Sequence, residues 1–397
     1  MNLAHSTSND GSMRRSSAQP IWTTLDMLED EKLPGGLGWF GNLMKPNTPQ
    51  RPSTAAGFGA SDDTAAVKLK FSHVVGSRGQ FNEPTHVAMK SSASQHGEVL
   101  CVADTANNRV QTLALHNGQS VNSIISKQSG GETLSFPRGI AASSGGDLYV
   151  VEHAGERVQR VRVSDGVTVA KSKKAKLKYP EGAALLDDSV LYVADTGNHR
   201  VSVFDAQSLE LKAHVGERGS KGGLAGEQPQ FKDPRGLALH DGKLFVADSR
   251  NDRLVVLSLA DHTVERVIGE TGTKPGQFKK PYGVAANDVA LFVTEEDGCR
   301  LQMLSHTGVP MQVVSFSSWN AKPWRGVSVG SPRSDGTSSV CAVMGSRVRA
   351  FTLQGKGSMG MPASRSSRVL VGPGPVQTQV EMSAPGDDAA GAGKEFV

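Results

Sequence analysis

One stretch of eleven residues recurs five times in the chain, and no other feature constrains the fold as strongly. The copies begin at Leu100 (LCVADTANNRV), Leu148 (LYVVEHAGERV), Leu191 (LYVADTGNHRV), Leu244 (LFVADSRNDRL) and Leu291 (LFVTEEDGCRL). A sixth, degenerate copy follows as SVCAVMGSRVRAFTL, with a turn two residues shorter and no acidic residue before it. The arginines of the copies recur every 43 to 53 residues, a spacing typical of β-propeller repeats.

Each repeat contains signals for four strands and none for a helix. In GLALHDGKLFVADSRNDRLVVLSL an Asp-Gly turn at Asp241 and Gly242 separates two apolar runs, a polar turn leads to a third, and TVERVIG at 263–269 supplies a fourth. Both faces of these strands are apolar, as expected where each small sheet packs between two neighbours. The sequence therefore predicts an all-β fold, a six-bladed β-propeller of four-stranded antiparallel blades, over residues 66–355.

The ring must also close, because an open ring would leave two unpaired sheet edges. The sixth copy has only three strand-like runs, and the segment VKLKFSHVVG at 67–76 reads as an outer strand with no strands of its own before it. We therefore expect this N-terminal strand to complete the last blade.

The two ends of the chain differ in composition from the repeats. Residues 1–65 and 356–397 are rich in Ser, Gly and Pro, which predicts disordered N-terminal and C-terminal regions. An apolar stretch at 21–44 interrupts the first of them and is compatible with a short docking segment.

Global composition points to no particular partner. The chain has 43 Lys and Arg against 39 Asp and Glu, a formal net charge of +4. It contains no apolar run of the roughly 18 residues that a membrane-spanning helix needs, and its N-terminus lacks the apolar run of a secretory signal. Its three cysteines, Cys101, Cys299 and Cys341, are too scattered for paired metal-ligand spacing and odd in number for a disulfide framework. We expect a cytoplasmic monomer with no membrane insertion, no bound metal and no cofactor.

Within a single copy, the acidic residue and the arginine could be taken for catalytic residues. A carboxylate at the end of a strand can accept hydrogen bonds from the turn that follows, and the arginine can reach back to it or to carbonyls of the neighbouring blade. A catalytic site is not needed five times around one ring, and the position of His199 is occupied elsewhere by Asn108, Glu156, Asp252 and Cys299. We therefore predict no catalytic residue here, but structural turn clamps: Asp104 with Arg109, Glu152 with Arg157, Asp195 with Arg200, Asp248 with Arg253, and Glu295 with Arg300.

Upstream of each copy lies a Pro-x-Gly-like start, often preceded by Gly-Gln-Phe, as in GQFNEP and GQFKKP. Together with L-Y-V-A-D-T-x-N-x-R-V, this pattern resembles the NHL-repeat family over about residues 66–355. The departures are Glu152 and Glu295 at the acidic position, His86 in place of the expected glycine, and the eroded sixth copy. The resemblance implies that the residue after each leading proline faces one side of the disc, around the mouth of the central channel. The candidate binding residues are Thr85, His86, Arg138, Glu181, Arg235, Tyr282, Trp324 and Arg325.

Three functions are compatible with this reading. The resemblance implies a non-catalytic protein-interaction scaffold, in a ubiquitin-ligase-related or signalling context, although residues 1–65 contain no Cys for a zinc-bound ligase module. The alternative is single-stranded RNA binding, since arginines and aromatic rings suit phosphates and bases. The Lys-rich run KSKKAKLK at 171–178 could add a phosphate contact or a localisation signal, or simply be a solvated loop. A second alternative, by resemblance to the peptidyl-hydroxyglycine amidating lyase, needs histidines on a channel metal, and only His86 stands at such a position.

Overall fold

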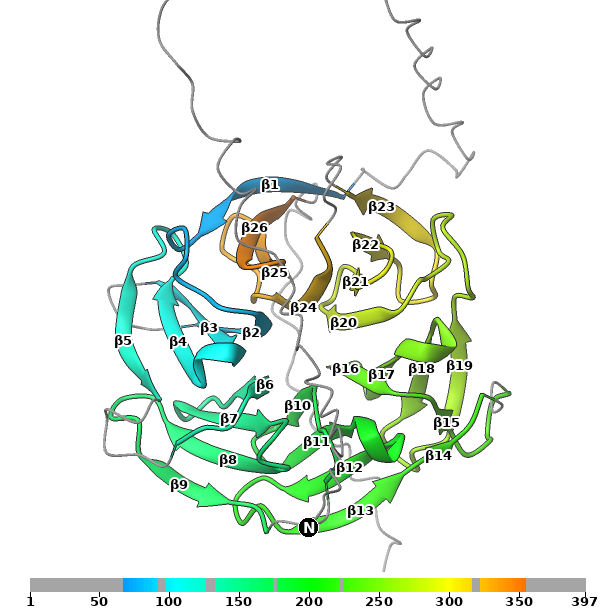
Figure 1. The fold of residues 1–397 in the computed structure, drawn as a ribbon. Coiled ribbons are helices and arrows are strands. Elements are labelled where there is room, and N and C mark those ends of the chain that lie inside the picture. Colours follow the sequence, from blue (N-terminus) through cyan, green and yellow to red (C-terminus); the bar gives the residue numbers. More distant parts are fainter. Residues whose placement is uncertain are drawn as a thin grey trace, which may run out of the picture. The chain divides into compact units, whose positions relative to one another are not determined.

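Six four-stranded antiparallel sheets surround a central axis in the computed structural model, which describes residues 67–91, 97–125, 133–173, 177–220, 224–315 and 322–354 (Figure 1). These residues belong to the second of two units of the chain, Ser61–Val397. The predicted six-bladed propeller is confirmed. The segment at 21–44, both predicted disordered regions and residues 174–176 of the Lys-rich run lie outside the described residues.

Each blade runs from an inner strand beside the axis to an outer strand at the rim. The first three blades are β2 (Pro84–Ser91), β3 (Glu98–Asp104), β4 (Arg109–Ala114) and β5 (Ser120–Ile125); β6 (Pro137–Ala142), β7 (Asp147–Glu152), β8 (Arg157–Arg162) and β9 (Thr168–Lys171); and β10 (Ala183–Leu186), β11 (Val190–Asp195), β12 (Arg200–Asp205) and β13 (Leu211–Val215). The last three are β16 (Pro234–His240), β17 (Lys243–Asp248), β18 (Arg253–Ser258) and β19 (Val264–Ile268); β20 (Pro281–Ala286), β21 (Leu291–Glu295), β22 (Arg300–Leu304) and β23 (Pro310–Val314); and β24 (Trp324–Val329), β25 (Ser338–Met344), β26 (Arg347–Gln354) and β1 (Lys68–Val75).

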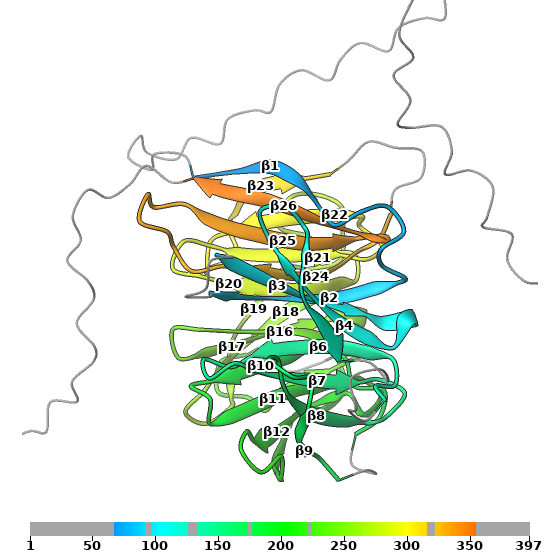
Figure 2. The ribbon, with the colours of Figure 1, turned by 90° about the vertical axis from the view of Figure 1, so that its left-hand side faces the viewer.

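The blades hold together through the apolar faces that the sequence shows on both sides of each strand. The leading leucine of every repeat is completely buried and packs against the preceding blade, as Leu244 does against the residues around Tyr192 and Val203. Leu100 of the first blade packs in the same way against Cys341 and Val343 of the sixth. The side view shows the sheets stacked face against face along the ring (Figure 2). The core is therefore a set of contacts between blades, and each blade depends on its neighbours.

The predicted closure of the ring is also present. β1 pairs antiparallel with β26, from Lys68 opposite Gln354 to Val75 opposite Val348, and forms the outer strand of the sixth blade (Figure 1). Leu69 and Val75 of this strand are buried, at 4% and 1% exposure. Strands from the two ends of the repeat region thus share one sheet.

The Gly-Gln-Phe segments have a steric explanation. Three blades end in a glycine at positive φ that packs on the phenylalanine ring of the next such segment, or of the Pro-Gln-Phe at 229–231, where a Cβ would crowd the ring: Gly76 with Phe81, Gly216 with Phe231, and Gly269 with Phe278. The three rings are buried. Where the chain returns from rim to axis after the third blade, the short parallel pair β14 (Glu217–Arg218) and β15 (Gln230–Phe231) adds backbone hydrogen bonds. These segments set where each inner strand begins.

Candidate functional site

The repeated acidic residue and arginine meet in each of the first five blades. The arginine Nε lies 2.5–2.9 Å from a carboxylate oxygen, and the acidic side chain has no exposed surface. The pairs are Arg109 with Asp104, Arg157 with Glu152, Arg200 with Asp195, Arg253 with Asp248, and Arg300 with Glu295. In the sixth blade Met344 stands at the acidic position, and the hairpin turns through Gly345 and Ser346 instead.

The carboxylate also holds the segment that approaches its own blade. In all five blades it accepts the backbone N–H of the residue two positions before the leading proline or its equivalent, at 2.6–3.0 Å, from Asn82, Ser135, Lys178, Lys232 and Lys279. The arginine reaches carbonyls of the same segment, as Arg253 does with Gln230 at 2.9 Å. These carbonyls belong to the same repeat, so the contact stays within one blade. The carboxylate is thus buried and hydrogen-bonded on several sides, and it ties the turn to the segment that approaches the blade.

The two kinds of acidic residue come with different partners, a feature that the sequence analysis missed. Where the acid is Asp, the residue three positions later is Asn and donates to it, as Asn107 does to Asp104 at 2.9 Å. Where it is Glu, that residue is Gly, and a Cβ at Gly155 would lie 2.5 Å from a Glu152 oxygen. The longer carboxylate thus fills the space that the Asn side chain occupies in the other blades. The paired change is visible in the sequence, but its reason is steric.

At the same end of the blades, where the leading prolines pair with the clamp acids, the starts of the inner strands bring six side chains together at one mouth of the central channel. Each blade contributes one of them; we call them the mouth cluster: His86, Arg138, Glu181, Arg235, Tyr282 and Arg325. The contacts run around the ring, since Arg138 donates to Glu181 at 2.5 Å and the Arg235 guanidinium lies 4.8 Å from the centre of the Tyr282 ring. The inner strands that carry these residues surround the axis in Figure 1.

Two of the sequence candidates do not face the mouth. Trp324 pairs with Met344, at the place of the leading proline in the other blades, and is 1% exposed, with its ring stacked 6.2 Å from Phe351. Arg325 is therefore the residue that follows the proline position in the sixth blade, and the expectation that Trp324 lies on the face is wrong. Thr85 is 2% exposed, and its hydroxyl donates to the Arg138 carbonyl at 3.2 Å, so this side chain joins two blades.

Burial and charge set the ionisation of the mouth cluster. Glu181 is 3% exposed; burial acts to raise the pKa of its carboxyl, but the positive charges of Arg235 and Arg138 outweigh burial, and the pKa is lowered. Arg235 also forms a 2.8 Å ion pair with Glu296. Burial, assisted by the arginines, lowers the pKa of His86 to about 4, although Glu181 acts in the opposite direction. At neutral pH the cluster therefore contains an ionised Glu181 and a neutral imidazole.

Residues 177–204, within the third repeat, match the sequence profile of the NHL repeat. The chain carries an NHL repeat. A stretch of 90 residues is 36% identical to NHL repeat-containing protein 2 of Gallus gallus and covers 21% of this chain and 12% of that protein. Another of 119 residues is 29% identical to Protein SUPPRESSOR OF QUENCHING 1, chloroplastic, of Arabidopsis thaliana and covers 29% of this chain and 10% of that protein. The chain thus spans about a tenth of the length of these relatives.

Solved structures resemble the NHL propeller in fold. A streptogramin B lyase structure superposes with a TM-score of 0.50 and 14% sequence identity, over 74% of this chain and 100% of that one. At this identity the likeness shows a shared propeller architecture only. The resemblance to the NHL-repeat family that the motifs indicated is confirmed by the profile match and by the six blades together.

The outer side of the mouth carries exposed aromatic rings. The residue before each leading proline has positive φ, between 46° and 54°, in Glu83, Phe136, Tyr179, Asp233 and Lys280. In the second and third blades this residue is aromatic: Phe136 is 42% exposed and Tyr179 is 50% exposed, with the His153 ring 5.3 Å from that of Tyr179. We call Phe136, His153 and Tyr179 the aromatic rim. The sequence analysis did not select these residues, although two aromatics directly before Pro-x-Gly were a usable signal.

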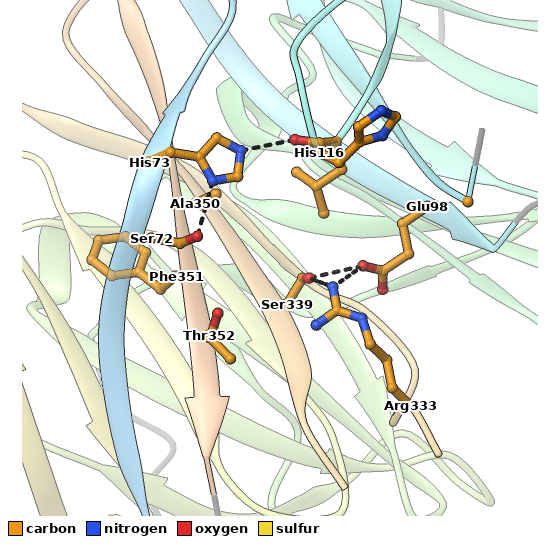
Figure 3. Close-up of a pocket in the computed structure, with 11 residues that line it drawn as sticks. Ser72, His73, Glu98, His116, Arg333, Ser339, Ala350, Phe351 and Thr352 are labelled. Carbon is orange, nitrogen blue, oxygen red and sulfur yellow. Dashed lines mark hydrogen bonds and ion pairs between the residues drawn. The ribbon is translucent and has the colours of Figure 1, made fainter. Parts of the chain in front are cut away.

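Two cavities accompany this site. The central channel of the NHL propeller has a volume of about 240 Å³ and is lined by inner strands, mostly by Ala and Val, with His86 at its mouth. A larger cavity of about 630 Å³ lies at the seam between the sixth and first blades (Figure 3). Its polar groups are engaged with one another: Arg333 pairs with Glu98 at 2.5 Å, and His73 Nε2 donates to the Leu115 carbonyl at 2.8 Å. Several buried polar groups without a hydrogen-bond partner lie at the mouth instead.

Within the described ranges, no three His, Cys, Asp or Glu side chains are grouped so that they could hold a metal ion. The same ranges contain no helix with the length and hydropathy needed to cross a membrane.

The low pKa of His86 predicts acid sensitivity. The unfolded chain takes up this proton near pH 6.5 and the folded chain only near pH 4, so the unfolded state binds more protons between these values and stability falls as the pH falls. We expect acidification from pH 7 to pH 4 to remove about 3 kcal/mol of His86-dependent stability. The variant His86→Gly carries the glycine that the other blades have at this position. Its free energy of unfolding, measured with urea at pH 7 and at pH 4, should lack the pH-dependent contribution of His86. His116→Gly, at an exposed turn, is the control. If the difference in unfolding free energy between wild type and His86→Gly is the same at both pH values, His86 is not the source of the acid sensitivity.

Proposed function

We propose that this propeller is a non-catalytic protein-interaction scaffold whose recognition surface is the face that carries the mouth cluster and the aromatic rim. The observation that supports this most is the exposure of Phe136 and Tyr179 beside a set of charged groups, since aromatic and arginine side chains dominate the energetics of protein interfaces. The carboxylates of the five turn clamps already accept hydrogen bonds from groups of their own blades, which fits a structural rather than a catalytic role.

Protein binding is favoured over RNA binding by the charge of the mouth. Two of the three arginines there are neutralised, because Arg138 pairs with Glu181, and Arg235 pairs with Glu296 while lying 3.8 Å from Glu181. An RNA strand needs a series of cations along its phosphates. A single uncompensated arginine in the mouth suits a partner with few charges.

A cytoplasmic location and a monomeric state are part of this proposal. The location is supported by the free thiols of Cys101 and Cys341, both buried, which fit a reducing compartment. One relative is named as a chloroplastic protein, so cell fractionation is the experiment that tests the cytoplasmic location. A ubiquitin-ligase or signalling context is carried over from the family resemblance.

Proximity labelling tests the choice of face. Arg138 and Arg235 are poor targets, because replacing them would leave Glu181 buried and unpaired. The double variant Phe136→Ser, Tyr179→Ser instead changes only exposed rings, and Val167→Ser, Val169→Ser is the matched control, since these residues are 43% and 44% exposed at the outer edge of the second blade. We expect the rim variant to lose partners that wild type and control share. Identical partner sets for all three proteins would rule out this face.

A further inference from the structure

The mouth cluster contains more hydrogen-bonding groups than it uses. His86 Nδ1, Glu181 Oε2 and the Nε atoms of Arg138 and Arg235 are buried without a hydrogen-bond partner among the described residues, and the buried Tyr282 hydroxyl is directed at Glu181, whose pKa it helps to lower. His86 is 8% exposed and Tyr282 1% exposed, so neither polar atom is simply turned to bulk water. Buried polar groups are normally satisfied, and a set of unsatisfied groups at one place indicates that something else completes it.

The side chains of His86 and Tyr282 lie next to each other although they come from different blades. Their rings are 5.6 Å apart, across the inner strand of the sixth blade. Gly326 makes this approach possible, because a Cβ there would lie 2.6 Å from the His86 Cα. Arg325 directly precedes this glycine, so its guanidinium belongs to the same corner of the mouth.

Arg325 is the cation of the mouth that has no countercharge. No hydrogen bond or ion pair of its guanidinium is formed within the described part of the chain, whereas Arg138 and Arg235 both have carboxylate partners. It is partly exposed, so it can be reached from the face. Burial keeps the neighbouring imidazole neutral, with a pKa of about 4, and raises the pKa of Tyr282, so both remain neutral at physiological pH.

We propose that this corner of the mouth binds one carboxylate of a protein partner, an Asp or Glu side chain of a segment lying across the face, with Arg325 as the charged partner and His86 as a neutral donor. The planar guanidinium matches a carboxylate in two parallel hydrogen bonds. The ionised Glu181 close by opposes any anion, and it opposes a phosphate, with its second charge, more strongly than a carboxylate. An ammonium group would face an uncompensated arginine.

The aromatic rim extends this site. His153 links the rim to the mouth cluster, because its ring lies 5.3 Å from that of Tyr179, tilted by 31°, and its Nδ1 lies 3.3 Å from the Pro180 carbonyl, next to Glu181. The rim belongs to the second and third blades, whereas Tyr282, Arg325 and His86 belong to the fifth, sixth and first, so the partner segment should cross the mouth and carry an apolar or aromatic residue at a distance from its acidic one. This inference rests on the proposed scaffold function and specifies the chemistry of its partner.

Selection from a phage library of random linear peptides on the full-length protein tests the inference. We expect enriched peptides to share an Asp or Glu and, at a constant spacing of several residues from it, an apolar or aromatic residue, and we would measure their binding as synthetic fluorescent peptides by anisotropy. Arg325→Gln in the protein, or Glu→Gln in the peptide, should each weaken binding about tenfold or more, and the two changes together should cost little more than either one. Arg162→Gln is the matched control, because Arg162 is half exposed and forms its ion pair with Asp165 on the outside of the second blade; this variant should bind like wild type.

The other results have distinct meanings. Peptides without a common acid, insensitive to Arg325→Gln but lost in the Phe136→Ser, Tyr179→Ser variant, would overturn the carboxylate site and leave the scaffold function standing. Binding that requires a free peptide C-terminus and is lost on amidation would overturn the side-chain assignment. Failure to enrich any peptide, with tight binding of a labelled single-stranded RNA pool instead, would overturn both proposals.

Discussion

Deletion of residues 66–76 is expected to leave the propeller insoluble or to lower its melting temperature sharply. The deletion removes β1, and with it the outer strand of the sixth blade and the buried side chains of Leu69 and Val75. Burial of such side chains contributes about 1.5–3 kcal/mol each, and the lost strand pairing adds to this, so the total approaches the 5–15 kcal/mol that stabilises a typical domain. The deletion would also expose the edge of β26, a template for aggregation.

A rearranged chain provides the control for this deletion. Because Lys68 lies opposite Gln354 in an antiparallel pair, residues 68–76 can be moved to follow Gln354 through an Asn-Gly turn, forming a hairpin with β26 in the same register. The composition of the protein is then nearly unchanged and the last blade is complete. We expect this protein to be soluble and to melt close to the wild type by circular dichroism. A deletion variant that melts at the wild-type temperature would show that closure by β1 is unimportant.

The second large effect is expected at the turn clamp of the second blade. Gly155→Asn should destabilise the protein by about 3–5 kcal/mol, because the new side chain occupies the space of the Glu152 carboxylate and forces it from its buried partners. Those partners are Arg157 at 2.9 Å, Gln159 at 2.5 Å and the backbone N–H of Ser135 at 3.0 Å. Urea unfolding at pH 7 measures the change.

The double variant Glu152→Asp, Gly155→Asn is the decisive comparison. It reproduces the first blade, where Asp104, Asn107, Arg109 and Gln111 occupy the same spacing. We expect it to recover to within about 1 kcal/mol of wild type, with Glu152→Asp alone destabilising, so that the two changes are strongly coupled. Additive effects would mean that the Glu-Gly and Asp-Asn pairs are unrelated.

Much of the fold could be predicted because its signals are local and repeated. The period of the Leu-to-Arg motif indicated the number of blades, the alternation of apolar runs and turns indicated four strands in each, and the missing strand of the last blade indicated closure by 67–76. These features follow from strand and turn chemistry acting over a few tens of residues, and repetition made each signal readable several times. Trp324 shows the limit of prediction from repeats. The sixth repeat has lost its leading proline and its turn is shorter, so its residues no longer correspond clearly to those of the other five.

The amino-acid sequence by itself determined the number of blades, their order around the ring and the positions whose acids and arginines form the turn clamps. Only the tertiary structure decided which of the variable side chains meet. Arg138 and Arg235 are separated by about two repeats from each other, yet share Glu181, while Arg325 remains without a countercharge beside His86. The physical reason is that a closed ring brings one residue from every blade to a common axis, where their charges act on one another within a buried space. A periodic sequence pattern indicates that such residues face one mouth, but not which of them neutralise each other and which remain available to a partner.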